Sequence, residues 1–281
     1  MKIIQQIEKL QATIREHLAD NQKLTVGFVP TMGSLHQGHL ELVKTAKQKA
    51  DIVVVSIFVN PTQFNNAKDL ETYPRNLDAD AELLKTVGCD VLFAPTEKEV
   101  YPTKPQKVEI DLNGLDSVME GAFRPGHFEG VLMVVKRLFD IVQPHLAFFG
   151  QKDFQQLSII QRMVKELNLP LEIVPVPIQR SQEGLALSSR NQLLSDQQKE
   201  DALILFNTLT LGKELSVSIK EAELLKDAML TKFNSGQLEL EYLSIVDNET
   251  LQEVKTISRP STICIAAYCG PVRLIDNMQI N

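Results

Sequence analysis

The segment Asp51–Val59, with the sequence DIVVVSIFV, is almost unbroken in apolar and β-branched residues. Such a segment is typical of a strand that is buried on both faces, as in a parallel sheet. A second strand is predicted at Leu24–Val29 (LTVGFV), ending at Pro30. Between the two strands, apolar residues recur at helical spacing: Leu40, Val43, Ala46 and Ala50. Strand, helix and strand in this order predict a β-α-β unit.

The same alternation continues to about residue 180. Further helical stripes begin at Leu77, Val131 and Phe154, and further strands are predicted at Val91–Ala94, Leu146–Phe149 and Leu171–Val174. Repeated units of this kind predict an α/β fold with a doubly wound, parallel, Rossmann-like sheet. Ligands bind such sheets beyond the carboxyl ends of the strands.

The pattern changes in the last hundred residues or so. Two capping boxes are predicted to open helices, one formed by Ser195 and Gln198 and the other by Ser218 and Glu221. Strands follow at Leu238–Ile245, Ser261–Tyr268 and Val272–Ile275, the last after a Cys269–Pro271 turn. We therefore expect two domains, a Rossmann-like domain at 1–180 and a smaller α+β domain at 181–281, joined by a hinge that contains Ser181–Gly184.

Composition excludes several classes of function. The net charge of −7 weighs against binding to nucleic acid, which needs a broad basic surface. No apolar run has the length needed to span a bilayer, and the N-terminus lacks the pattern of a signal peptide, so we expect a cytoplasmic protein that does not bind membranes. Cys89, Cys264 and Cys269 form no CxxC pair and are expected to be reduced, partly buried thiols.

The most informative motif is Pro30–His39, PTMGSLHQGH, between the first strand and the first helix. His36 and His39 lie at the helix N-terminus, where unpaired backbone N–H groups and the helix dipole favour phosphate. Gly33 and Gly38 allow the backbone to approach a ligand closely. In the alternative, one histidine caps the helix and the other packs. An HxGH sequence directly after a strand favours the nucleotide-binding interpretation.

Two more motifs follow strands. Asn60 and Gln63, in NPTQF, could bind hydroxyl and carboxylate groups through their amides, although an exposed Asn-Pro turn explains this segment equally well. Gly150–Asp153 (GQKD) places Lys152 where it could bind phosphate and Asp153 where it could cap a helix. The alternative is a plain helix start with a solvated lysine.

Two loops carry cations. Phe123–Phe128 (FRPGHF) places Arg124 and His127 in a loop before a helix, and taken alone this segment is better explained as a surface turn. Gly184–Asn191 (GLALSSRN) offers two serines and an arginine, which suit a mobile loop that closes over phosphates.

Together with YPR at Tyr73–Arg75 and RLIDN at Arg273–Asn277, these segments resemble the pantothenate synthetase (pantoate–β-alanine ligase) family over nearly the whole chain. HQGH and SSR are also similar to the HIGH and KMSKS motifs of the wider nucleotidyltransferase superfamily. The resemblance implies that pantoate's carboxylate attacks the α-phosphorus of Mg-ATP, which gives pantoyl adenylate and pyrophosphate. The amine of β-alanine then displaces AMP to form pantothenate.

The resemblance also implies roles for individual residues. Contacts with ATP are expected from Met32, Gly33, His36, His39, Gly150, Lys152, Asp153, Gln179, Leu187, Ser188, Ser189 and Arg190. Of these, His39 would be the catalytic proton donor, assisted by His36, Lys152 and Arg190, and Gly150 and Asp153 would lie near the ribose. Contacts with pantoate are expected from Asn60, Gln63, Arg124 and Gln156, and Gln63 would also contact β-alanine.

The family pattern leaves other points open. It assigns no Mg²⁺ ligand here, and it implies a homodimer in which the 1–180 domain binds ATP and pantoate while the second domain carries the SSR loop at the hinge. Gln151, Glu183 and Leu187 stand where the family commonly has glutamate, aspartate and methionine. None of these departures removes a group assigned to the chemistry.

The proposed chemistry needs concentrated positive potential, because a carboxylate is repelled by the polyphosphate that it attacks. No serine or cysteine lies in a triad-like motif, so no covalent intermediate on the enzyme is expected. Two alternatives are a nucleotidyltransferase that moves AMP onto another small substrate and a catalytically silent ATP-binding module. Pyrophosphate–ATP exchange that depends on pantoate would distinguish all three.

Overall fold

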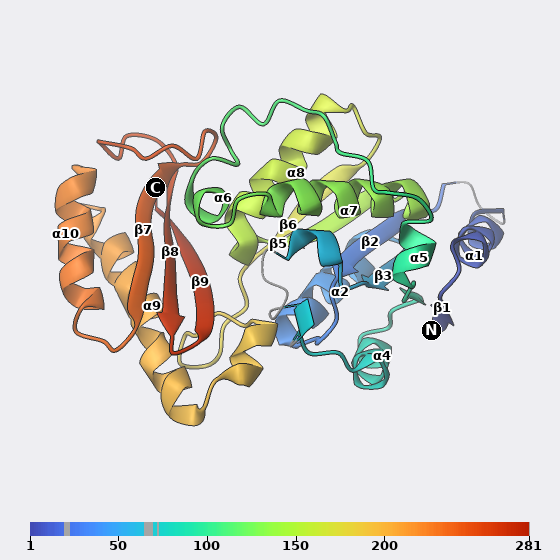
Figure 1. The fold of residues 1–281 in the computed structure, drawn as a ribbon, viewed down its shortest axis with the longest axis horizontal. Helices are drawn as coiled ribbons and strands as arrows, with labels where there is room; N and C mark the ends of the chain where they lie inside the picture. The colour runs from blue at the N-terminus through green and yellow to red at the C-terminus, as the bar shows by residue number, and fades with distance from the viewer. Residues whose placement is uncertain (20–22, 65–69, 72, 281) are drawn as a thin grey trace. The chain divides into compact units, whose positions relative to one another are not determined.

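The computed structural model describes residues 1–19, 23–64, 70, 71 and 73–280 of the chain. These residues form two compact units, coloured along the chain in Figure 1. The first unit comprises residues 1–112, 124–151 and 159–177, and the second comprises 113–123, 152–158 and 178–281. The second unit therefore consists of residues 178–281 together with two segments from earlier in the chain. The two predicted domains, divided at 180/181, do not include these earlier segments in the second domain.

The first unit contains a parallel sheet in which the described residues form six strands in the order β1-β4-β3-β2-β5-β6. Their bounds are Lys2–Ile4 (β1), Val26–Thr31 (β2), Ile52–Ile57 (β3), Val91–Phe93 (β4), Leu146–Gly150 (β5) and Glu172–Val176 (β6). From β2 the chain moves outward to β3 and β4, and from β5 it moves outward to β6 in the opposite direction. The carboxyl ends of β2 and β5 therefore flank a topological switch point, where doubly wound folds bind ligands.

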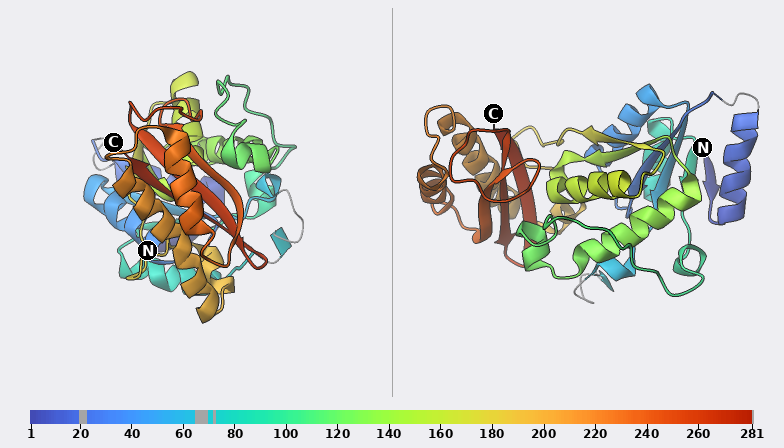
Figure 2. Two further views of the ribbon diagram at one scale, coloured as in Figure 1. Left: turned by 90° about the vertical axis from the view of Figure 1, so that its left-hand side faces the viewer. Right: turned by 90° about the horizontal axis from the view of Figure 1, so that it is seen from above.

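Helices flank this sheet. They are α1 (Ile7–Ala19), α2 (Gln37–Lys49), α4 (Leu77–Thr86), α5 (Glu97–Val100), α7 (His127–Val142) and α8 (Phe154–Glu166), whose first turn is counted with the second unit. Helix α2 packs against α4, α1 packs against α7, and α8 runs beside α7 (Figures 1 and 2). The predicted α/β class and its helical stripes are confirmed. Within the described residues, no helix combines the length and apolarity required to cross a bilayer.

Strand β2 runs further than predicted, through Pro30 to Thr31. The carbonyl of Thr31 accepts a hydrogen bond from Phe58 N, so Thr31 faces β3, and alternation turns Pro30 away from β3. The pairing of β2 with β5 covers Gly27 and Phe28 and ends before Pro30. The missing N–H of Pro30 therefore interrupts no hydrogen bond of the sheet.

The second unit contains an antiparallel sheet that, in the described part of the chain, has three strands in the order β7-β8-β9. These are Glu239–Asp247 (β7), Ser261–Cys269 (β8) and Val272–Ile280 (β9), and the helices are α6 (Met119–Phe123), α9 (Asp196–Leu215) and α10 (Ala222–Phe233). Helices α9 and α10 pack together against one face of the sheet (Figure 2). The predicted turn before Val272 is confirmed, with Gly270 at a positive φ of 58°.

One of the two predicted capping boxes is present. Ser195 Oγ accepts from Gln198 N and Gln198 Oε1 accepts from Ser195 N, which opens α9. The box at Ser218 and Glu221 was wrong, because Ser218 Oγ donates backward to the carbonyl of Leu215. Glu221 is itself the N-cap of α10 and makes no side-chain capping bond.

The cysteines are free and buried, more completely than expected. Burial raises the pKa of the Cys89 thiol to about 12 and that of Cys264 still further. Both thiols are therefore protonated and poorly reactive in the folded protein at neutral pH.

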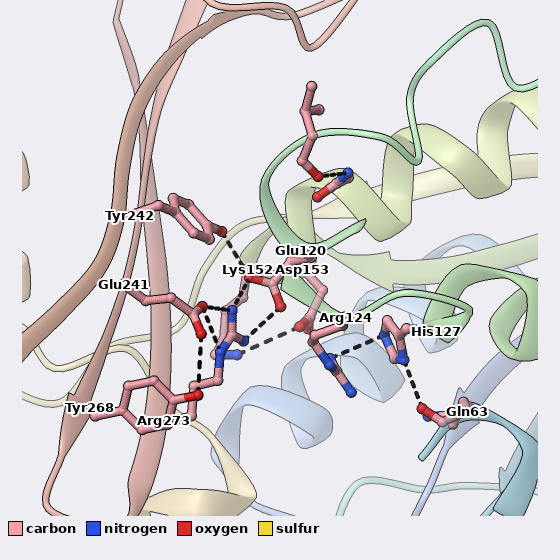
Figure 3. A network of polar contacts seen from close by, with 12 residues as sticks. Gln63, Glu120, Arg124, His127, Lys152, Asp153, Glu241, Tyr242, Tyr268 and Arg273 are labelled. Carbon is pink, nitrogen blue, oxygen red and sulfur yellow. Dashed lines mark hydrogen bonds and ion pairs between the residues drawn. The ribbon is translucent and has the colours of Figure 1, made fainter. Parts of the chain in front are cut away.

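A buried ionic cluster joins α6 to the sheet of the second unit (Figure 3). Arg273 on β9 donates to both carboxylate oxygens of Glu120, at 2.7 and 2.8 Å, and also pairs with Glu241 on β7. Tyr242 donates to Glu120 at 2.8 Å, and Tyr268 donates to Glu241 at 3.1 Å. The cluster thereby holds residues 113–123, a segment that is distant in sequence from β7 and β9, against these strands.

Replacing Arg273 with methionine leaves two carboxylates in a buried environment without their cation. We expect Arg273→Met to lower the free energy of unfolding by about 3–5 kcal/mol, measured by urea denaturation with circular dichroism. Lys199→Met, which breaks an exposed pair with Asp196, should cost less than about 1 kcal/mol. Adding Glu120→Gln to Arg273→Met should recover part of the lost free energy of unfolding, because one uncompensated carboxylate is removed. If nothing is recovered, buried unpaired charge is not the cause of the loss.

Candidate functional site

The two histidines of HQGH cap helix α2 reciprocally. His36 is the N-cap, and its Nδ1 accepts a hydrogen bond from Gly38 N at 3.1 Å. The Nδ1 atom of His39 accepts from His36 N at 3.3 Å, which completes a capping box built from two imidazoles. Their ring centroids lie 4.0 Å apart. The alternative in which a histidine caps the helix is thus structurally correct for His36, and His39 joins it in the cap.

This cap determines the chemistry that the histidines can offer. An Nδ1 atom that accepts from a backbone N–H carries no proton, so each neutral ring carries its proton on Nε2. Nε2–H is a hydrogen-bond donor of the kind that stabilises negative charge on phosphate oxygens. Capping and phosphate binding therefore use different nitrogens and are compatible in the same residue.

Several backbone N–H groups that were expected to be unpaired at this helix N-terminus are paired within the protein, and phosphate binding there stays a prediction. Besides Gly38 N in the cap, the N–H groups of His39 and Leu40 bond to the carbonyl of His36 at 2.9 and 3.1 Å. The preceding loop is likewise paired, since Ser34 N and Leu35 N donate to the carboxylate of Asp80 at 2.8 and 2.7 Å. The imidazoles and the α2 dipole, rather than these amides, remain to attract an anion.

Asp80, on α4, is 3% exposed and holds the loop in an unusual conformation. Gly33 and Ser34 both have positive φ, 81° and 52°. A Cβ on Gly33 would lie 3.0 Å from both Asp80 Oδ2 and Ile57 Cγ2, so glycine is required there for space as well as conformation. Gly33 is buried, and its expected contact with ATP stays a prediction.

Asn60 follows β3 and is fully engaged by the protein. The side chain is 1% exposed, which contradicts an exposed Asn-Pro turn. Its Nδ2 donates to the Gly130 carbonyl at 3.1 Å and to Gln63 Oε1 at 3.3 Å. Its Oδ1 accepts from the Tyr101 hydroxyl at 3.1 Å and from Thr62. This geometry makes Asn60 the residue that orients Gln63.

The RPGHF segment contains an exposed turn at Pro125 and Gly126, as expected, but its histidine is held inside the protein. His127 is buried and is the first residue of α7, after Gly126 with its φ of 82°. Its Nε2 lies 3.1 Å from Arg124 Nη1 and its Nδ1 lies 2.8 Å from the backbone carbonyl of Gln63. Because arginine is always a donor, Nε2 of His127 accepts and Nδ1–H donates, the opposite tautomer to those of His36 and His39.

Three predicted motifs therefore come together within the first unit. Gln63 Nε2 contacts Met32 Sδ at 3.0 Å. Figure 3 shows the hydrogen bonds that connect Gln63 to His127 and His127 to Arg124. Gly130 makes this approach possible, because a Cβ there would lie 2.4 Å from the carbonyl oxygen of Thr62. The TMGSLH, NPTQF and RPGHF segments are thus neighbours in space.

The GQKD segment starts with Gly150 at the end of β5 and continues as a 3₁₀ turn, η2 (Gln151–Asp153), directly into α8. Asp153 lies inside this turn, so its expected role as an N-cap was wrong. Lys152 Nζ lies 3.7 Å from Asp153 Oδ1, and the lysine side chain is 18% exposed rather than fully solvated. Gln156 is half-buried on the first turn of α8.

The SSR segment follows a short hairpin in the second unit. Arg180 forms a bridge with Ala186, and Leu187 N donates to the Gln179 carbonyl at 2.9 Å. The predicted hinge residues Ser181–Gly184 form the turn of this hairpin, closed by Gly184 N to the Ser181 carbonyl at 3.0 Å. Ser188 Oγ accepts from Arg190 N and caps the 3₁₀ helix η3 (Ser189–Leu193), in which Ser189 is buried.

Sequence reasoning missed the residues that hold these motifs in place, chiefly Asp80, Tyr101 and Gly130. Each contacts a motif from a distance along the chain: 46 residues from Ser34 to Asp80, 41 from Asn60 to Tyr101 and 70 from Asn60 to Gly130. Asp80 lies shortly after the YPR segment. This position is the one feature of the sequence that could have indicated a role for Asp80 near the site.

Comparisons with known proteins agree with this arrangement. Residues 2–279 match the family model described as pantoate–β-alanine ligase. The chain is 48% identical to pantothenate synthetase of Bacteroides fragilis, over 99% of both chains, and 46% identical to that of Thermosipho africanus, over 100% of both.

Solved structures give the same result. The crystal structure of pantothenate synthetase from Thermus thermophilus superposes with a TM-score of 0.91 at 40% identity, covering 99% of each chain. Pantoate–β-alanine ligase from Francisella tularensis, complexed with β,γ-ATP and β-alanine, superposes with a TM-score of 0.83 at 38% identity, covering 99% of this chain and 97% of the other.

The contact between Asp80 and the loop can be tested without an activity assay. In Asp80→Asn the amide can accept only one of the two N–H groups and presents its own donors to the other. We expect the amide protons of Ser34 and Leu35 to exchange faster with deuterium and the free energy of unfolding to fall by about 1.5–3 kcal/mol.

Asp90→Asn is the matched control, because Asp90 accepts from Val53 N at 2.7 Å near the amino ends of the strands. It should speed exchange at Val53 and leave Ser34 and Leu35 unchanged. Unaltered exchange at both loop amides in Asp80→Asn would remove Asp80 from this role.

Proposed function

Because the chain belongs to the pantoate–β-alanine ligase family, we propose that it joins pantoate to β-alanine by way of a pantoyl adenylate. The chain is a ligase that uses ATP for this condensation. The proposal concerns the route: pantoate's carboxylate displaces pyrophosphate at the α-phosphorus, and the amine of β-alanine then displaces AMP.

The observation that carries this proposal is the meeting of three motifs in the first unit. Gln63 contacts Met32 on one side and His127 on the other, and His127 holds Arg124. These segments lie at the carboxyl ends of β2 and β3 and at the start of α7, beside the switch point of the sheet. The segment proposed to bind the nucleotide and the segments proposed to bind the carboxylate are therefore adjacent, as an adenylation reaction requires.

In the first step, the protein must offset repulsion between a carboxylate and a triphosphate. The Nε2–H donors of His36 and His39 stand at the positive end of the α2 dipole and are proposed to bind phosphate oxygens. His39 would stabilise the charge that grows as the α-phosphorus is attacked. The rate increase then comes from orientation and electrostatic stabilisation, without a covalent intermediate on the enzyme.

Pantoate is proposed to bind at Gln63, with Asn60 orienting the Gln63 amide rather than competing for the ligand. Arg124, whose Nη1 bonds to His127, is proposed to bind the carboxylate of pantoate through its guanidinium group. Gln156 completes the proposed pantoate contacts. The same Gln63 would meet β-alanine in the second step, which accords with the family resemblance.

Further phosphate contacts are proposed for Lys152, Ser188, Ser189 and Arg190. Gly150 and Asp153 are proposed to lie near the ribose, and Gln179 and Leu187 are proposed to contact ATP. Mg²⁺ is proposed to arrive on the phosphates of ATP, as it commonly does in enzymes of phosphoryl and nucleotidyl transfer. A homodimer and a cytoplasmic location are further proposals that rest on the family resemblance.

The route is tested by pyrophosphate–ATP exchange. We expect exchange that requires pantoate and proceeds without β-alanine, because adenylation precedes the entry of the amine. Exchange that requires β-alanine would contradict the adenylate route. Exchange with other acids but not with pantoate would change the substrate while leaving adenylation in place.

His39 is predicted to be essential for adenylation. His39→Ala should lower the rate of pantoate-dependent exchange on the order of 10²-fold or more, because the Nε2–H donor is lost. His39→Gln should preserve the capping box and hence the melting temperature, yet remain slow. His17→Ala, at an exposed position on α1, should behave as wild type. A near-normal rate of adenylate formation in His39→Ala would remove His39 from this role.

A further inference from the structure

The RLIDN motif on β9 has a clear structural role at Arg273 but no role in the function proposed above. Its last residue, Asn277, is buried and makes a contact that points to one. Asn277 Nδ2 donates to the backbone carbonyl of Lys152 at 2.8 Å. Both residues belong to the second unit, and they lie 125 positions apart in sequence. The C-terminal strand therefore holds the backbone that carries the Lys152 ammonium group.

The neighbouring residue, Asp276, anchors a second segment. Its carboxylate is 4% exposed and accepts a bidentate pair from Arg180, at 2.6 and 2.9 Å. The same carboxylate accepts from Asn277 N at 2.8 Å, and Arg180 Nη2 also donates to the Asn277 carbonyl at 3.2 Å. Burial raises the pKa of the Asp276 carboxyl, whereas Arg180 and the nearby charge of Lys152 lower it. Asp276 and Asn277 are thus coupled through Arg180.

Arg180 in turn holds the hairpin that leads into the SSR segment. Its Nη1 donates to the Gly184 carbonyl at 3.1 Å, and its guanidinium lies 4.8 Å from the centre of the Phe206 ring. Gly184 fits against that ring because it lacks a side chain: a Cβ there would lie 2.1 Å from Phe206. The hairpin from Gln179 to Leu187 is therefore fixed at its turn and at its open end.

We propose that the Asp276–Asn277 pair is a positioning element for ATP, which holds the Lys152 segment and the hairpin before Ser188 in one fixed relation. Two proposed phosphate-binding segments, separated by 36 positions from Lys152 to Ser188, are thereby joined through a single strand. A rigid relation matters because displacing a charged group by about 1 Å can cost as much as 10²-fold in rate. The inference rests on the proposed function, since that function assigns Lys152 and the SSR segment to the phosphates.

Asn277→Ala is the test variant, because it removes the bond to Lys152 and retains the Asp276–Arg180 pair. We expect the Kd for a non-hydrolysable ATP analogue to rise roughly tenfold or more, while the KM for pantoate in the exchange assay stays within about twofold. Asn277→Gln, which retains an amide donor on a longer side chain, should restore part of the affinity. Asn277→Ser replaces the alanine variant if circular dichroism shows that alanine prevents folding.

A double-mutant cycle with Lys152→Ala separates positioning from general destabilisation. If Asn277 acts through the Lys152 ammonium, Asn277→Ala should have almost no further effect on the Kd once that ammonium is gone. Asn248→Ala is the control, because it removes a 2.7 Å bond from Thr262 on β8 to the turn after β7 and should leave the Kd unchanged.

The outcomes distinguish this inference from the proposed function. A wild-type Kd in Asn277→Ala, or effects of Asn277→Ala and Lys152→Ala that simply add, would overturn the positioning role. Suppose that the wild-type protein shows no pantoate-dependent exchange, while Asn277→Ala still raises the Kd for the ATP analogue. This result would overturn the proposed function and leave the positioning role standing.

Discussion

His36 and His39 each accept a backbone N–H through Nδ1, and the phosphate-binding role proposed for the first unit depends on this reciprocal cap. The cap places both imidazole rings at the N-terminus of α2 and leaves Nε2 as the protonated nitrogen of each. The loop before them directs its amides to Asp80 instead of outward. An anion that approaches this helix is therefore met by imidazole donors and the helix dipole, which differs from the amide nest of a glycine-rich phosphate loop.

Buried charge plays a corresponding part in the second unit. Arg273 holds α6 through Glu120, and Asp276 holds the 179–187 hairpin through Arg180. Both residues lie on β9, so one strand fixes segments that are distant in the sequence. Pairs of this kind add little net stability when compared with apolar packing, but removing one partner of a pair is costly. The short antiparallel sheet thus acts as the frame for residues proposed to bind phosphate.

The sequence predicted the elements well where local pattern decides them. The apolar run at β3 and the helical stripes of α2, α4 and α7 gave the correct class, because burial on both faces leaves a direct signature in composition. The end of β2 was predicted too early because of Pro30. A proline is tolerated at that position only because the pairing of β2 with β5 has already ended. The motifs themselves were found, but their partners were not: Asp80, Tyr101 and the contact from Asn277 to Lys152 follow from tertiary structure, which no local pattern encodes.

Whether His36 and His39 are neutral donors through Nε2–H can be measured directly by ¹⁵N NMR of the histidine side chains at neutral pH. The chain provides an internal contrast, because His127 is held in the opposite tautomer by Arg124 and the Gln63 carbonyl. We predict a protonated Nε2 and an unprotonated Nδ1 for His36 and His39, and the reverse for His127. A proton on Nδ1 of either His36 or His39 would contradict the reciprocal cap and the phosphate-binding role that depends on it.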